Sequence, residues 1–141
     1  MSKLCPSSQP ALDRCRVLGV VRRDGPAPML EYLNEHVPAT PEVLAMTAPL
    51  KPTEVFRLAA TCAEHVCPHY DGKDCRLASR IVQILPAVVD VLPPCIIRKE
   101  CRWYSQEGAA ACRRCPGITT VNYNPSLQTQ EVSGLPMIEE V

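Results

Sequence analysis

The sequence predicts a mainly α fold: a small, cysteine-rich helical domain around a metal or iron–sulfur site, with irregular N- and C-terminal arms. Two stretches, 53–66 and 77–92, carry apolar residues at helical spacing. Six of the nine cysteines fall within residues 67–115. Fifteen prolines, with one Trp and one Phe, indicate short elements and a thin core, which small domains often reinforce with a bound metal.

A chain of 141 residues is expected to form one domain with looser ends. Residues 1–28 are predicted to be a basic, irregular N-terminal arm, in which 16–21 (RVLGVV) can form a short strand before the turn sequence DGPAP. Residues 29–123 are predicted to form the helical cysteine-rich domain. Residues 124–141 are expected to be an extended C-terminal tail.

The first helical segments are expected between residues 29 and 67. Residues 29–50 are predicted to form short helical turns, with Thr40 as an N-cap and Pro41 at the first helical position. A firmer helix is predicted from Thr53, and it should end at Cys67 because Pro68 disfavours helical geometry in the residue before it.

A long core helix is predicted to follow, with Asp74 as its N-cap and an apolar stripe from Leu77 to Leu92. Pro86 should kink or split it. Ser105 can cap a last helix that stops at the sequence Cys-Pro-Gly of 115–117, and 118–123 (ITTVNY) is prone to form a strand.

Composition sets the expected compartment. The first residues, MSKLCPSSQPALDRC, lack the apolar region of a secretion signal, and the most apolar stretch, 81–97, is interrupted by Gln83, Asp90 and three prolines. We therefore expect a cytoplasmic protein without a membrane segment. Thiols stay reduced there, so nine cysteines indicate metal or redox chemistry rather than disulfides.

The candidate cofactor ligands are six cysteines, spaced C-x7-C-x19-C-x5-C-x10-C-x2-C. Several stand where one element should end and another begin, so that a loop can direct the sulfur inward. Basic residues lie around the last three, and positive charge stabilises thiolates and an anionic cluster. The six are Cys67, Cys75, Cys95, Cys101, Cys112 and Cys115.

Three interpretations of this set compete. Four of the cysteines can hold an iron–sulfur cluster of the [4Fe–4S] type, for which ligation by cysteine alone is typical. The sequence C-x2-C-P resembles the end of ferredoxin-type motifs, but the C-x2-C-x2-C run of bacterial ferredoxins is absent. Four can instead hold a structural zinc ion, with His65 or His69 as a nitrogen ligand, although only one close C-x2-C pair is present. The third interpretation is reduced core cysteines or a reactive dithiol at Cys112 and Cys115.

We expect Cys112 and Cys115 to be the firmest ligand pair and Cys67 with Cys75 to complete the four, while Cys95 and Cys101 can replace either pair. Cys62 lies in an apolar stripe and is expected to pack in the core. Cys5 and Cys15 are expected to be incidental.

The motifs favour a non-enzymatic role, because no G-x-G-x-x-G, P-loop or H-E-x-x-H pattern is present. The expected functions are electron transfer, redox sensing or service as an accessory subunit; the alternative is a zinc-stabilised module that binds protein or nucleic acid. A protein partner is expected at a basic-aromatic patch, and nucleic acid is less favoured because acidic and basic residues balance at 15 each. The patch comprises Arg98, Lys99, Arg102, Trp103, Arg113 and Arg114.

Overall fold

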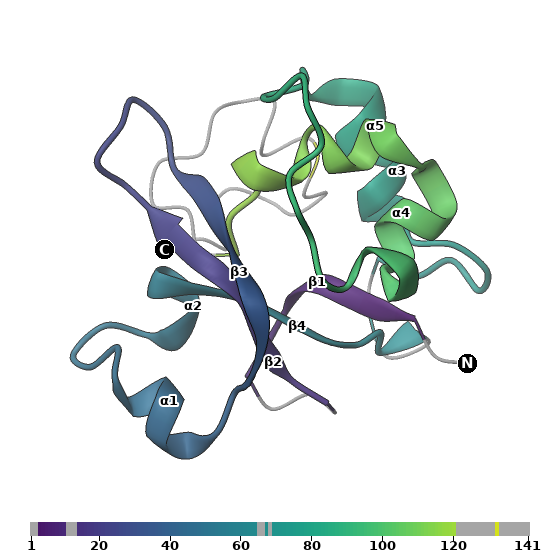
Figure 1. The fold of residues 1–141 in the computed structure, drawn as a ribbon. Helices are drawn as coiled ribbons and strands as arrows, with labels where there is room; N and C mark the ends of the chain where they lie inside the picture. The colour runs from purple at the N-terminus through teal and green to yellow at the C-terminus, as the bar shows by residue number, and fades with distance from the viewer. Residues whose placement is uncertain (1–2, 11–13, 65–66, 68, 121–131, 133–141) are drawn as a thin grey trace, which may run out of the picture.

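The computed structural model describes residues 3–10, 14–64, 67, 69–120 and 132. In these residues a four-stranded antiparallel sheet packs against short helices (Figure 1). The strands are β1 (Leu4–Ser8), β2 (Arg16–Arg22), β3 (Met29–Pro38) and β4 (Phe56–Thr61), in the spatial order β1-β4-β2-β3. The helices are α1 (Pro41–Ala45), α2 (Pro52–Val55), α3 (Arg76–Ile84), α4 (Arg102–Glu107) and α5 (Ala109–Cys112), with the 3-10 turns η2 (Arg98–Glu100) and η3 (Cys115–Gly117).

The sheet shows that the mainly α prediction is wrong, because the fold combines α and β structure. Strands β1 and β2 lie within the expected irregular N-terminal arm, and β2 confirms the short strand at 16–21. Strand β3 occupies the first ten residues of the segment 29–50, which was expected to form helical turns. Of the prediction for 29–50, the Thr40 cap is confirmed: its side chain accepts a hydrogen bond from the Val43 N–H at the start of α1.

The largest difference between the predicted and the observed structure is at β4, which lies in the segment expected to be a helix from Thr53 to Cys67. Only its first turn is helical, as α2, and the chain then becomes a central strand paired with both β1 and β2. Leu58, Ala59 and Ala60 are each fully buried. A strand covered on both faces has no polar alternation, and alanine favours helices, so its sequence resembles a buried helix.

The other predicted helices are shorter than expected. Helix α3 begins after Cys75 and ends at Ile84, since Leu85 precedes Pro86 and has extended geometry (φ −89°, ψ 146°). The stretch 85–92 is therefore not helical. Helix α4 begins at Arg102, before the expected Ser105 cap, and Gly108 with φ +72° separates it from α5.

Residues 118–120 of the expected last strand are not a strand, and 121–123 lie outside the described residues. The expected C-terminal tail, 124–141, also lies outside them except for Val132. That residue is 3% exposed and belongs to the core. None of the described helices has the length and apolar character needed to cross a membrane.

The core lies between the sheet and the layer of α3, α4 and α5, which gather on one side of it (Figure 1). Trp103 of α4 is the largest fully buried side chain, with 1% of its surface exposed. Leu18 of β2 and Ala59 of β4 face this layer from the sheet, and Ile81 of α3 and Ala111 of α5 complete it. Three cysteines, Cys75, Cys101 and Cys115, are part of the same core.

Strand β2 needs glycine at position 19, where its register with β3 and β4 shifts. A Cβ atom at Gly19 would stand 2.4 Å from the backbone oxygen of Glu31 and 2.7 Å from Leu30 Cδ1. Because a backbone oxygen cannot rotate away, a side chain here forces β2 and β3 apart.

We expect Gly19→Ala to lower the free energy of unfolding by about 3 kcal/mol, the upper end of the usual cost of overpacking. Chemical denaturation followed by circular dichroism measures this. The matched control is Gly25→Ala, where the nearest atom to the new Cβ is 4.0 Å away. Equal denaturation midpoints for the two variants would contradict the strand register described above.

Candidate metal centre

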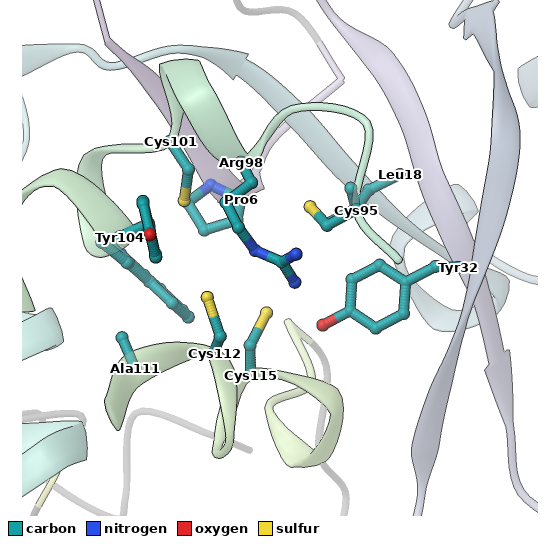
Figure 2. Close-up of a pocket in the computed structure, with 11 residues that line it drawn as sticks. Pro6, Leu18, Tyr32, Cys95, Arg98, Cys101, Tyr104, Ala111, Cys112 and Cys115 are labelled. Atoms are coloured by element: carbon teal, nitrogen blue, oxygen red, sulfur yellow. The ribbon is translucent and has the colours of Figure 1, made fainter. Parts of the chain in front are cut away.

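Four cysteines line one pocket between the sheet and the helical layer: Cys95, Cys101, Cys112 and Cys115. Figure 2 shows their sulfur atoms directed toward a common space, with Cys112 and Cys115 approaching from one side and Cys95 and Cys101 from the other. The free volume of this pocket for water-sized contents is about 20 Å³.

The C-x2-C turn is held by the backbone of the segment after α3. Arg114 donates from Nε to the Leu85 oxygen at 2.6 Å and from Nη1 to the Ala110 oxygen at 2.8 Å. The N–H of Val88 donates to the Arg113 oxygen at 2.9 Å. These bonds fix the turn between α5 and η3, and so fix the positions of Cys112 and Cys115.

The other pair is placed by two prolines and a 3-10 turn. Pro93 and Pro94 end the preceding loop, and the Arg98 N–H donates to the Cys95 oxygen at 3.3 Å. Turn η2 then delivers Cys101 as the residue before α4. Cys101 is 8% exposed, and so is Cys115.

Arg57 is the residue at this site that the sequence did not single out. It stands on β4 and is fully buried, and its Nη2 lies 2.6 Å from the Cys115 sulfur. Its other donors bond backbone oxygens: Nε to Pro6 at 2.8 Å, and Nη1 to Ile118 at 2.9 Å and to Cys115. Among the described residues it forms no ion pair with a carboxylate. A buried guanidinium is costly unless its donors are satisfied, and the Cys115 sulfur is the side-chain atom in place to accept from it.

Two further donors at the pocket have no acceptor within the described part of the chain. They are Arg98 Nε and the indole N–H of Trp103, both buried. Figure 2 shows the Arg98 guanidinium reaching among the sulfurs and the Tyr32 hydroxyl facing Cys115. Buried donors without partners are costly, so this pocket is suited to an occupant that accepts hydrogen bonds and carries negative charge.

Burial favours the protonated form of two of the four thiols, Cys95 and Cys101. Burial raises the pKa of Cys101 to about 12, although the backbone N–H groups of Tyr104 and Trp103 oppose the effect. Burial also raises the pKa of Cys95, against the N–H of Ile97. The same N–H groups would stabilise thiolates once a metal has displaced the protons, so metal binding here releases protons.

The structure divides the first-choice ligand set between two places. Cys112 and Cys115 line the pocket described above, whereas Cys67 and Cys75 line a second, larger cavity. The partners of Cys67 and Cys75 there are Cys5 and Cys62, which sequence reasoning set aside as incidental and as core. The signal that could have revealed Arg57 is a lone charge within the otherwise apolar run of β4.

The chain before Cys75 turns at Asp71. Asp71 accepts hydrogen bonds from the N–H groups of Lys73 and Asp74 at 3.0 and 2.7 Å, and those bonds hold the pKa of its carboxyl below the usual value. Gln106 of α4 then clamps the backbone of Cys75, accepting from its N–H at 2.7 Å and donating to its oxygen at 2.8 Å.

The residues of the expected basic-aromatic patch do not share one surface. Trp103 is buried, and Arg102 pairs with Glu64 at 3.0 Å with 14% of its side chain exposed. Arg98 and Arg114 turn toward backbone oxygens. Lys99 is exposed, and a protein partner at this patch stays a prediction.

No three His, Cys, Asp or Glu side chains of the described residues lie close enough together to hold a single metal ion. In comparisons with known proteins, no family model, curated protein or solved structure matches the chain.

We expect Arg57→Met to lower the free energy of unfolding by about 3 kcal/mol. The substitution leaves the carbonyl oxygens of Pro6 and Ile118 without their hydrogen-bond donor and removes the cation beside Cys115. Urea denaturation measures the loss. Arg22→Met is the matched control, since Arg22 lies in a strand with an exposed ion pair, and its effect should stay within about 0.5 kcal/mol. A similar small effect for Arg57→Met would show that the buried contacts contribute little.

His69 gives a prediction about acid. Burial lowers its pKa, and the charges of Arg80 and Arg76 add to the effect; its Nδ1 lies 3.0 Å from Arg80 Nη2. A lowered pKa means that the unfolded chain binds the proton first, so stability falls as pH drops from about 7 to about 5. His69→Gln should lose less stability over this range than the wild-type chain. The control is His36→Gln, at an exposed position, which should follow the wild-type curve; superimposable curves for all three would contradict the assignment.

Proposed function

We propose that the chain is an iron–sulfur protein that binds a [4Fe–4S] cluster through Cys95, Cys101, Cys112 and Cys115 and serves in one-electron transfer. The observation that carries the proposal is the ring of four cysteine sulfurs around one pocket, with the buried Arg57 guanidinium against one of them (Figure 2). Two of these four come from the first-choice set, and the other two were its expected replacements.

The arrangement suits a cluster better than a zinc ion. Zinc requires four donors that converge on one point at about 2.3 Å. In a [4Fe–4S] cluster each thiolate binds a different iron, so the four sulfurs stand around the cofactor rather than at its centre. The pocket has sulfurs on opposing sides, as the cluster needs, with the Arg98 guanidinium reaching between them.

The chain's own charges fit the same cofactor. A bound cluster takes up and releases one electron at a time, and positive surroundings raise its potential. Arg57 and Arg98 supply that charge, and the unpartnered N–H groups of Arg98 and Trp103 supply hydrogen bonds for sulfur acceptors. Low exposure of Cys101 and Cys115 keeps water from that side, which favours electron transfer over sensing of a soluble oxidant.

An electron carrier needs a surface where a redox partner can approach. Tyr104 lines the pocket and is 37% exposed, and Lys99 on η2, five positions earlier in the sequence, is also exposed. Of the expected basic-aromatic patch, the proposal keeps only this exposed edge, as the place where a protein partner would bind.

Anaerobic purification followed by absorption and EPR spectroscopy tests the proposal. We expect a brown protein containing iron and sulfide. Each of the variants Cys95→Ser, Cys101→Ser, Cys112→Ser and Cys115→Ser should lose the iron and sulfide of this one cluster. Cys15→Ser is the matched control, since Cys15 lines neither cavity, and it should keep the full content. Colourless protein holding one zinc, or folded protein without metal, would overturn the proposal.

A further inference from the structure

Eight of the nine cysteines fall into two groups of four, each around its own cavity. The second cavity is lined by Cys5 of β1, Cys62 just after β4, Cys67, and Cys75 just before α3. Segments far apart in the sequence are thus brought together by the β1–β4 pairing, in which Leu4 stands opposite Thr61. The Cys62 N–H donates to the Lys3 oxygen at 2.8 Å, so this pairing continues up to the cysteine.

The members of this group lie within electrostatic range of one another. Burial raises the pKa of Cys5 to about 11, and Cys75 and Cys62 add to the rise. Burial likewise raises the pKa of Cys75, with contributions from Cys67 and Cys62. Each thiol of the group therefore has at least one other as an electrostatic neighbour.

The second cavity also repeats the charge pattern of the first. Arg102 lines it, lies beside Cys62, and stacks over Tyr70 with 5.5 Å to the ring centroid. Its buried Nε has no hydrogen-bond acceptor among the described residues. The indole of Trp103 lines this cavity as well as the first, and its one N–H is counted with the first. The unpartnered Nε of Arg102 beside a group of four thiols points to a missing anionic acceptor.

The cavity has room for a cofactor. Its free volume for water-sized contents is about 450 Å³, which far exceeds the 10–15 Å³ or so that a single water needs. Around the sulfurs the lining is mostly apolar or hydroxyl-bearing, with Leu77, Ile81 and Ser7 as examples. His69 is the histidine in the lining, and Arg80 Nη2 lies 3.0 Å from its Nδ1.

We infer that the chain carries a second metal centre, an iron–sulfur cluster held by Cys5, Cys62, Cys67 and Cys75. It is separate from the centre proposed above, because it uses different ligands in a different cavity, and each can be tested without the other. Trp103 stands between the two as a shared wall.

Counting iron and sulfide in anaerobically purified protein tests the inference. Two four-cysteine [4Fe–4S] sites give about eight iron atoms per chain. We expect the double variant Cys62→Ser/Cys75→Ser to keep about half of the iron and sulfide, and the Cys112→Ser/Cys115→Ser variant to keep the other half. Cys15→Ser should keep all of it. Full iron content in the folded Cys62→Ser/Cys75→Ser variant would overturn the second centre.

A measurement without mutation covers the case in which that variant does not fold. The native wild-type protein is treated anaerobically with iodoacetamide and mapped by mass spectrometry, before and after the iron is removed by a chelator under oxidising conditions and the thiols are reduced again. We expect Cys5, Cys62, Cys67 and Cys75 to be protected before removal and modified after it. Modification of these four while Cys95, Cys101, Cys112 and Cys115 stay protected would overturn the second centre and leave the first. Zinc in place of iron at the second site would overturn its assignment as a cluster.

Discussion

The contact between Arg57 and Cys115 is the interaction on which the rest of the structure depends. One fully buried guanidinium joins β1 through Pro6, the turn after α5 through Cys115, and the following segment through Ile118. It therefore links the sheet to the part of the helical layer that carries the C-x2-C pair. A cation in this place is unfavourable unless its donors are satisfied, so the contacts with Pro6, Ile118 and the Cys115 sulfur are what allow Arg57 to stand in the core.

What could be predicted from the sequence is explained by local chemistry. The Thr40 cap and the strand at 16–21 depend on one or two neighbouring residues. Asp74 is not the cap of α3, which has Cys75 in that position, and the helix expected to reach Leu92 ends at Ile84. Strand β4 could not be predicted in this way, because Leu58 and Ala60 are covered on both faces by segments far away in the sequence. Pairing then overrides a helix-like local pattern.

The two groups of cysteines show the same division between local and distant information. The C-x2-C spacing marked Cys112 and Cys115 as candidate ligands, and Cys95 and Cys101 were among the six candidates. The grouping of Cys5 and Cys62 with Cys67 and Cys75 arises only from the β1–β4 pairing, which brings residues about sixty positions apart to one cavity. The predicted set combined Cys67 and Cys75 with Cys112 and Cys115, and the fold places these two pairs on different cavities.

Trp103 is the one tryptophan of the chain, and it borders both cavities. A rigid ring shared by two pockets cannot shift toward one without shifting away from the other. Anything that moves the ring on filling the first cavity changes the affinity of the second by the same coupling free energy, and the reverse holds equally. Trp103, which separates the two cavities, is thus also the residue through which filling one cavity would change the affinity of the other.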